Sequence, residues 1–150
     1  MNSAKIFKTK LLATINDNRS ILIRLIVGLV FLSEGIQKYL FPGLLGTGRF
    51  LKIGFSHPEF WAYFTGTFEI ICGTFILLGM LTRPASVPLI IIMITAFITT
   101  KWPILIDNGF WSMAHEYRVD FAMTFLLLYL IIYGSGSWSI DSAIKKSFKT

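Results

Sequence analysis

Long apolar stretches alternate with short polar segments along the chain. Four stretches, at about 20–41, 59–81, 84–100 and 114–133, each approach the roughly 20 residues that a helix needs to cross a bilayer. They are continuously apolar, whereas the strands of a membrane barrel would alternate, so they favour helices. The fourth must begin near Ala114, because its purely apolar part is too short alone. The pattern predicts an all-α membrane protein, a four-transmembrane-helix antiparallel bundle.

Helix-start and helix-stop signals frame these stretches. Ser56 and Glu59 have the spacing of a capping box, and Pro58 suits the first turn, where its missing donor costs nothing. Thr82-Arg83-Pro84 is a tight connection that places Pro84 at the start of the third stretch. Gly134 follows the fourth stretch and is expected to end it.

The composition fits a membrane protein and excludes several other classes. Hydrophobic residues make up 54% of the chain and charged residues 15%, against about 25% charge in soluble domains. A soluble domain of 150 residues could not bury this apolar surface, and disorder requires low hydrophobicity. The single cysteine, Cys72, allows no internal disulfide, so a self-sufficient membrane thiol oxidoreductase is not expected.

The distribution of Lys and Arg predicts the orientation. The net charge is +6, and most of the basic residues lie in the tails, where lipid headgroups and topology explain them better than nucleic acid. One side would carry eight, namely Lys5, Lys8, Lys10, Arg19, Arg83, Lys145, Lys146 and Lys149; the other would carry Arg49, Lys52 and Lys101. Both termini should therefore be cytoplasmic, in a bacterial-type cytoplasmic (inner) membrane.

This orientation divides the chain into three parts. We expect a basic cytoplasmic segment at 1–19, a membrane domain at 20–142 and a basic cytoplasmic tail at 143–150. The first apolar stretch is too long for a signal peptide and lacks a good cleavage site, so we expect it to be retained.

Ionisable residues inside the predicted spans are the strongest functional signal. Each costs about 2.5–3.5 kcal/mol at the centre of a bilayer on the insertion scale. Glu34 and Lys38 stand in the favourable order for a helical ion pair, and Glu69 lies near the middle of the second span. The topology predicts a polar pocket in the outer half of the bundle, lined by Glu34, Lys38, Glu69, Thr95, Thr99, Trp102, Glu116 and Asp120. The alternative is structural, since buried polar groups also fix helix register in some proteins.

The outer segments allow further interpretations. Residues 46–55 and 101–111 mix aromatic and basic residues, which suits either a lid over the pocket or an aromatic belt at the headgroups, and we favour the belt. His57 and His115 at the helix mouths could ligate haem or a metal in principle. No ligand-spacing motif supports this, so we expect no metal.

Several motifs together resemble the DoxX family. They are Arg24 to Lys38 around Gly28, Phe31, Glu34 and Gly35, then Phe68-Glu69 to Gly73, Gly79 to Arg83, Met93 with Ala96, Trp102-Pro103, His115-Glu116, Gly134-Ser135-Gly136 and Ser139-Ile140-Asp141. The resemblance implies a four-helix membrane bundle with polar positions at Arg24, Lys38, Glu69, Arg83, Glu116 and Asp141. It also implies a link to quinone or sulfur redox chemistry, because the family includes the small membrane subunit of a thiosulfate:quinone oxidoreductase.

These observations lead to one leading hypothesis and two alternatives. The chain is expected to be a membrane subunit of a quinone-linked oxidoreductase, with no intrinsic cofactor and with a quinone headgroup or a small sulfur oxyanion in the pocket. Lys38 would supply charge or a hydrogen bond, Glu69 and Glu116 would exchange protons, and a partner protein would supply the redox centre. The alternatives are a proton-coupled carrier of a small solute and a non-enzymatic assembly subunit, each compatible with a homo-oligomer.

Overall fold

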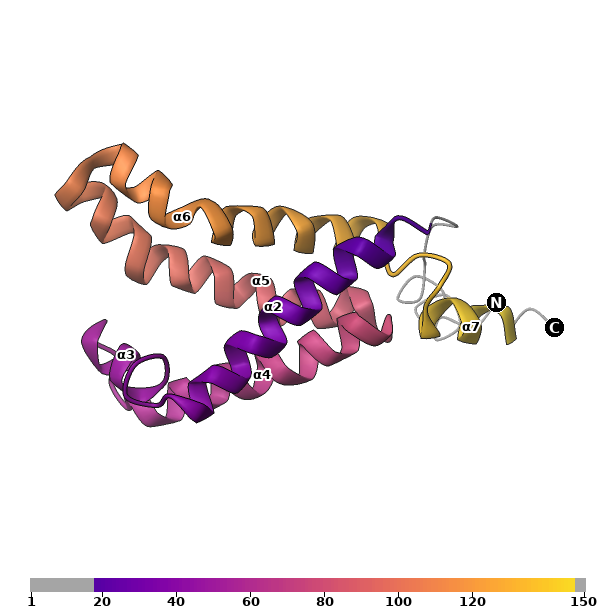
Figure 1. The fold of residues 1–150 in the computed structure, drawn as a ribbon, viewed down its shortest axis with the longest axis horizontal. Coiled ribbons are helices and arrows are strands. Elements are labelled where there is room, and N and C mark those ends of the chain that lie inside the picture. The colour runs from indigo at the N-terminus through magenta and orange to yellow at the C-terminus, as the bar shows by residue number, and fades with distance from the viewer. Residues whose placement is uncertain (1–17, 148–150) are drawn as a thin grey trace, which may run out of the picture.

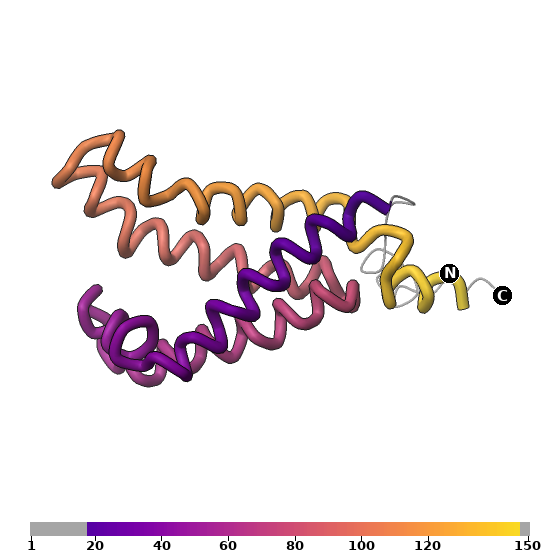
Figure 2. Tube along the Cα trace, in the orientation of Figure 1, coloured from indigo at the N-terminus to yellow at the C-terminus, as the bar shows by residue number. Residues whose placement is uncertain are grey.

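The structure, a computed structural model, describes residues 18–147. These residues are helical and contain no strand: α2 spans Ser20–Leu40, α3 Thr47–Lys52, α4 Pro58–Leu78, α5 Thr82–Ala96, a π-helical turn (η1) Phe97–Lys101, α6 Trp102–Tyr133 and α7 Ile140–Ser147 (Figures 1 and 2). The predicted all-α class is confirmed. The basic tail residues Lys5, Lys8, Lys10 and Lys149 lie outside the described residues.

Three segments within residues 18–147 are long and apolar enough to cross a membrane. They are α2, α4 and the continuous helical run Thr82–Tyr133, which has 52 residues. A straight helix of that length would be more than twice as long as a bilayer core is thick. The run instead folds back on itself, so that α5 and α6 pack side by side (Figure 1). The reversal includes Gly109, whose φ of 79° is not helical.

Glycines bring α2 and α4 into close contact. A Cβ atom on Gly35 would lie 2.7 Å from the carbonyl oxygen of Gly66, and one on Gly73 would lie 3.0 Å from the backbone nitrogen of Leu32. Residues without side chains allow two helices to approach in this way. The α2–α4 pair is accordingly the most extensive helix contact in the described structure.

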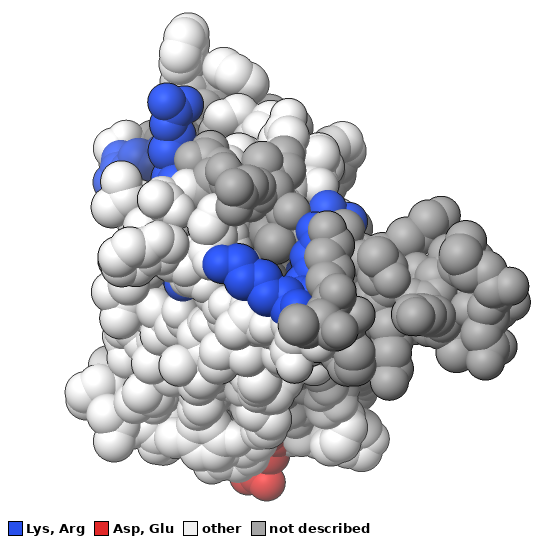
Figure 3. All heavy atoms as spheres, turned by 90° about the vertical axis from the view of Figure 1, so that its right-hand side faces the viewer, with Lys and Arg blue, Asp and Glu red and all other residues white. Residues whose placement is uncertain are grey.

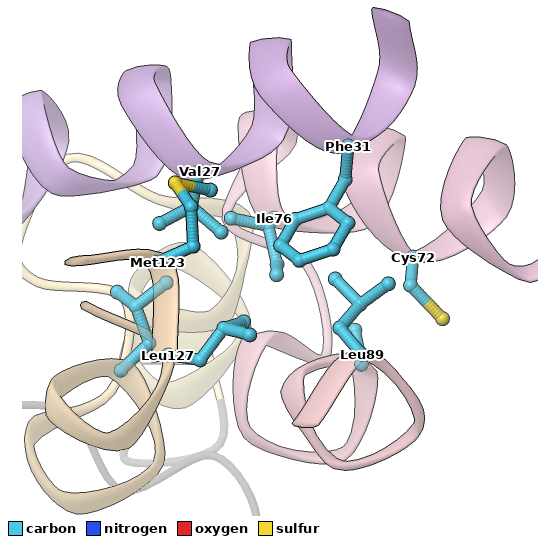
Figure 4. Packing of buried hydrophobic residues seen from close by; sticks show 9 residues of the cluster. Val27, Phe31, Cys72, Ile76, Leu89, Met123 and Leu127 are labelled. Atoms are coloured by element: carbon cyan, nitrogen blue, oxygen red, sulfur yellow. The ribbon is translucent and has the colours of Figure 1, made fainter. Parts of the chain in front are cut away.

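The apolar core joins this pair to α5 and α6. Figure 4 shows Val27 and Phe31 of α2 pointing toward Ile76, Leu89 and Leu127, with Cys72 at the edge of the cluster. Phe31, Ile76, Leu89 and Leu127 are almost completely buried. The core lies toward the end of the bundle that carries α7. We call this the closed end, defined by Arg24, Ser135 and Asp141.

At the opposite end the two helix pairs diverge (Figure 1). We call this the open end, defined by Lys38, Arg49, Lys101 and Glu116. It holds α3 and the reversal between α5 and α6. Because the helices lie farther apart at the open end, a cavity can form between them there.

Several predicted boundaries differ from the structure. The N-cap of α4 is His57, in the left-handed conformation and with no side-chain capping bond, so the predicted Ser56–Glu59 capping box does not form. The third helix begins at Thr82, two residues before Pro84, because the Asp141 carboxylate accepts from its first backbone N–H groups. The predicted outer loop after residue 101 is helical, and α6 begins at Trp102 instead of Ala114. Pro103 falls in the first turn, where proline is compatible with a helix. The predicted end at Gly134 is confirmed.

Candidate functional site

A cavity of about 740 Å³ occupies the open end of the bundle. Side chains from α2, α3, α4, α5, η1 and α6 line it, so the site depends on the whole fold. Of the eight residues predicted for the pocket, seven line this cavity, namely Glu34, Lys38, Glu69, Thr95, Thr99, Glu116 and Asp120. The volume falls within the range of roughly 300–1,000 Å³ that is typical of small-molecule sites.

Lys38 and Glu69 form a buried ion pair between α2 and α4. Lys38 Nζ lies 2.5 Å from Glu69 Oε2, and the two side chains are 10% and 4% exposed. Lys38 Nζ also donates to the backbone oxygen of Glu34 at 3.4 Å. The predicted ion pair between Glu34 and Lys38 is therefore wrong. Gly66 lies opposite Lys38, where an added Cβ atom would be 3.4 Å from Lys38 Cβ, and this close approach brings the lysine within reach of Glu69 on the next helix.

Lys101 forms a second polar centre, on the wall made by η1 and α6. Its side chain is 10% exposed, and its Nζ lies 3.6 Å from Asp120 Oδ2 and 3.9 Å from Glu116 Oε2. It also donates to the backbone oxygen of Glu116 at 3.1 Å. Sequence reasoning placed Lys101 in an exposed loop and missed this role. The π-helical turn Phe97–Lys101 directly precedes α6, and such turns often occur at functional sites.

The two threonines predicted for the pocket donate their hydroxyl protons to backbone oxygens. Thr95 Oγ1 donates to the Ile91 oxygen at 2.9 Å, and Thr99 Oγ1 donates to the Thr95 oxygen at 2.8 Å. A hydroxyl has one proton to donate. In this geometry both threonines line the cavity as hydrogen-bond acceptors.

Aromatic side chains cover the mouth between α3 and α4. Phe50 contacts Phe55, and Phe55 contacts Trp61, with ring centroids 5.4 and 6.0 Å apart. Phe50, Phe55, Trp61 and Arg49 all line the cavity. The segment 46–55 thus covers the site, the geometry that the lid interpretation requires. Leu51 within this segment and Leu44 just before it remain exposed, as in a belt.

Trp102 is the predicted pocket residue that does not line the cavity. Its side chain is half exposed and contacts Phe97, with the rings 6.4 Å apart. Trp111, at 84% exposure, lies outside it as well. Both residues were expected in a loop that could fold over the pocket, but the helical start of α6 directs them elsewhere.

The histidines lie apart from the buried pairs. His115 contacts Arg118 Nη1 through its ring and lines a second, shallower hollow together with Glu116, while His57 stands at the N-cap of α4. Within residues 18–147, no three His, Cys, Asp or Glu side chains lie close enough to hold a metal ion.

The ionisable residues lining the cavity nearly balance in charge. The bases are Lys38, Arg49 and Lys101; the acids are Glu34, Glu69, Glu116 and Asp120. Three positive charges therefore face four negative ones, and the two buried lysines each have an acid within 4 Å. Arg49 was also missed by sequence reasoning, because a basic residue in a loop is usually solvated.

The polar residues of the closed end do not join the cavity. Arg24 Nη1 donates to the backbone oxygens of Ser135 and Trp138 at 2.8 and 2.7 Å. Asp141 accepts from the backbone nitrogens of Leu81 and Thr82 at 2.7 and 3.1 Å. The Arg24 contacts tie the segment after α6 to α2, and the Asp141 contacts tie α7 to the α4–α5 turn.

Comparison with known proteins identifies the family. The DoxX family profile matches residues 20–102. The chain is 49% identical over 132 residues to the membrane protein Rv3486 of Mycobacterium tuberculosis, covering 84% of this chain and 81% of that protein. It is 30% identical over 131 residues to the proposed oxidoreductase CatD of Bacillus subtilis, covering 87% and 90%. No solved structure matches the chain. On the strength of the matched profile and of both relatives, this chain is a membrane protein of the DoxX family.

Proposed function

We propose that this protein is a membrane subunit of a quinone-linked oxidoreductase and that the cavity at the open end binds the quinone headgroup. The observation that carries the proposal is a roomy cavity walled by apolar and aromatic side chains, with two buried lysines among its lining. Such a site suits a flat ring with carbonyl oxygens, because aromatic faces pack on the ring and ammonium groups donate to the oxygens. The relative CatD, named as a proposed oxidoreductase, supports the same direction.

The residues of the cavity suit the proton side of the reaction. A quinone becomes a quinol when it takes up two electrons and two protons. The electrons come from the redox centre of a partner protein. The Lys38–Glu69 pair holds one carbonyl in a nearly dry environment. Glu116, whose side chain is 58% exposed, connects the cavity to the outer water and can pass protons inward.

The charge balance favours a quinone over a sulfur oxyanion. An anion needs uncompensated positive charge, whereas the acids of the lining outnumber the bases. A carrier is also less suited, because the apolar core at the closed end, around Phe31 and Leu127, blocks a path through the bundle.

The proposal includes a topology of four membrane crossings with both termini in the cytoplasm. The run Thr82–Tyr133 would cross twice, since α5 and α6 lie side by side. Viewed from the closed end, the surface shows Lys and Arg side chains across the face, while acidic ones are visible at its lower edge (Figure 3). Besides the buried Arg24, the described basic residues near this end are Arg19, Arg83, Lys145 and Lys146. By the positive-inside rule this end is cytoplasmic, and the cavity faces the outer leaflet.

Two experiments test the function and the topology. Protein purified in a mild detergent should carry ubiquinone or menaquinone detectable by mass spectrometry, and Lys38→Gln should lose it while Lys52→Gln, an exposed lysine of α3, retains it. Quinone-free protein that also fails to bind an added short-chain quinone would refute the function. Separately, alkaline phosphatase fused after Thr150 should be inactive, and activity there would refute the topology.

A further inference from the structure

Two buried ammonium groups line the cavity from different walls. Lys38 belongs to α2 and is paired with α4, whereas Lys101 ends η1 and is paired with α6. These helix pairs diverge at the open end (Figure 1), and the cavity lies between them. A ligand in the cavity therefore meets a lysine on each wall.

Each ammonium group retains a proton for a ligand. An ammonium has three N–H donors. Within the described structure, Lys38 Nζ donates to Glu69 Oε2 and to the Glu34 oxygen, which leaves one. Lys101 Nζ donates only to the Glu116 oxygen, since the carboxylates at 3.6 and 3.9 Å are beyond hydrogen-bond distance, which leaves two. Their acidic partners also hold both side chains in place.

The charges of the lining restrict the ligand. Each buried lysine already has an acid within 4 Å, and the lining carries four acids against three bases. An anion would have to displace these carboxylates or be repelled by them. The threonines of the same wall donate to their own helix. The two buried lysines thus offer donors on opposite walls, and the lining carries no surplus positive charge.

We propose that Lys101 is a second recognition residue and that the cavity selects an uncharged ring with acceptor oxygens at both ends, as in a para-dione. This inference rests on the proposed function and refines its substrate class. Lys38 binds one carbonyl oxygen and Lys101 the other. A ring with one carbonyl can use only one of the two lysines.

The test compares a bicyclic ligand that has two carbonyl oxygens with a bicyclic ligand that has one. The probes are 2,3-dimethyl-1,4-naphthoquinone, which has no open ring position for addition, and 2,3-dimethyl-1-tetralone, which keeps the bicyclic frame and one oxygen. Calorimetric titration of the detergent-solubilised full chain should show about tenfold tighter binding of the dione, the worth of one hydrogen bond to a charged donor. In Lys101→Met the preference should fall below about twofold. Lys101→Arg should restore it, because arginine keeps the charge and the donors.

Controls separate this inference from the proposed function. Lys52→Met removes an exposed lysine of α3 outside the cavity lining and should keep the preference. Lys101→Met should fold, because its partners Asp120 and Glu116 reach solvent, at 26% and 58% exposure. A tenfold preference that persists in Lys101→Met overturns the inference and leaves the proposed function intact. Failure of the wild-type protein to bind either probe overturns both.

A competition experiment addresses the charge of the ligand. Excess sodium thiosulfate, compared with sodium sulfate at equal ionic strength, should leave dione affinity unchanged within about twofold. Competition specific to thiosulfate would show that the cavity accepts an anion and would overturn the uncharged-ligand assignment.

Discussion

Buried charges at the two ends of the bundle have different partners. At the closed end, Asp141 is bound to the backbone nitrogens of Leu81 and Thr82, and Arg24 to the backbone oxygens of Ser135 and Trp138. At the open end, Lys38 is bound to the side chain of Glu69, beside a cavity. The residue types are alike, yet one set fastens chain segments together and the other lines a space large enough for a ligand.

The partner therefore decides what a buried charge does. Peptide groups have no second protonation state at ordinary pH, so a charge whose partners are all peptide groups is fixed and acts as a fastening. A carboxylate can exchange protons and rearrange, and an ammonium with an unused donor can bind a ligand. Intramembrane charge alone does not separate these cases, although all four residues are costly to bury.

The largest effect on stability is expected at the closed end. Asp141→Ala leaves the N–H groups of Leu81 and Thr82 without an acceptor at the start of α5. Two hydrogen bonds to a charged group contribute roughly 3–6 kcal/mol together. The free energy of unfolding, measured by denaturant titration in detergent, should fall by about that amount. Asp107→Ala, at an exposed position of α6, serves as the control and should change little.

A small effect of Asp141→Ala would contradict the fastening role. No second substitution should rescue this variant, since its partners are backbone atoms. At the open end the partner of Lys38 is the side chain of Glu69, so a second substitution can rescue the first.

Lys38→Met should destabilise the protein by about 3–5 kcal/mol, because it removes the partner of Glu69 and leaves that carboxyl group unpaired in a buried place. The double variant Lys38→Met with Glu69→Met should recover to within about 1 kcal/mol of wild type, since apolar residues of similar size can replace a buried pair. Both variants should lose quinone binding. A stable double variant that still binds the dione would show that the pair is structural only.

Sequence reasoning reached the helical class, the three clearest apolar segments and seven of the eight predicted residues that line the cavity. It succeeded there because the cost of burying Glu34, Lys38 and Glu69 is visible in the sequence. It did not identify the partner of Lys38. The four-residue spacing of Glu34 and Lys38 describes contacts within one helix, whereas the observed pair with Glu69 depends on how closely α4 approaches α2. Gly35 and Gly73 stand out in the sequence motifs, but the sequence does not define which residue of the partner helix each of them meets.

The next largest loss of stability is expected from a substitution at Gly35, where α2 and α4 are in close contact. Gly35→Ala would place a Cβ atom 2.7 Å from the Gly66 oxygen and 2.8 Å from Ile70 Cγ1, so the helices must separate. Overpacking of this kind costs about 1–3 kcal/mol. Gly43→Ala, whose Cβ would have no atom within 4 Å, is the matched control and should be neutral. If thermal unfolding shows equal stability for the two variants, close packing does not set the distance between Lys38 and Glu69.

The burial of Lys101 was harder to predict from the sequence than the close helix contact at the glycines. A lysine next to Trp-Pro reads as a loop residue at the headgroups, and no local pattern predicts the π-helical turn Phe97–Lys101 before it. Its burial results from the long-range packing of α5 on α6, which brings Asp120 and Glu116 to it. Trp102, the next residue, was assigned to the pocket by the same reasoning and lies outside it.

The smallest effect on dione binding is expected from a substitution at Trp102. Comparing it with a substitution at Trp61 distinguishes a residue that lines the cavity from one that lies outside it. Trp61 lines the cavity and contacts Phe55, so Trp61→Ala should weaken dione binding by roughly three- to tenfold, the worth of one aromatic contact. Trp102→Ala should leave the affinity within about twofold, because its half-exposed ring packs on Phe97 outside the cavity. Calorimetric titration of both variants measures the contrast. A larger loss in Trp102→Ala than in Trp61→Ala would mean that the ligand enters along α6 rather than beneath α3, and the open end would then need a different wall.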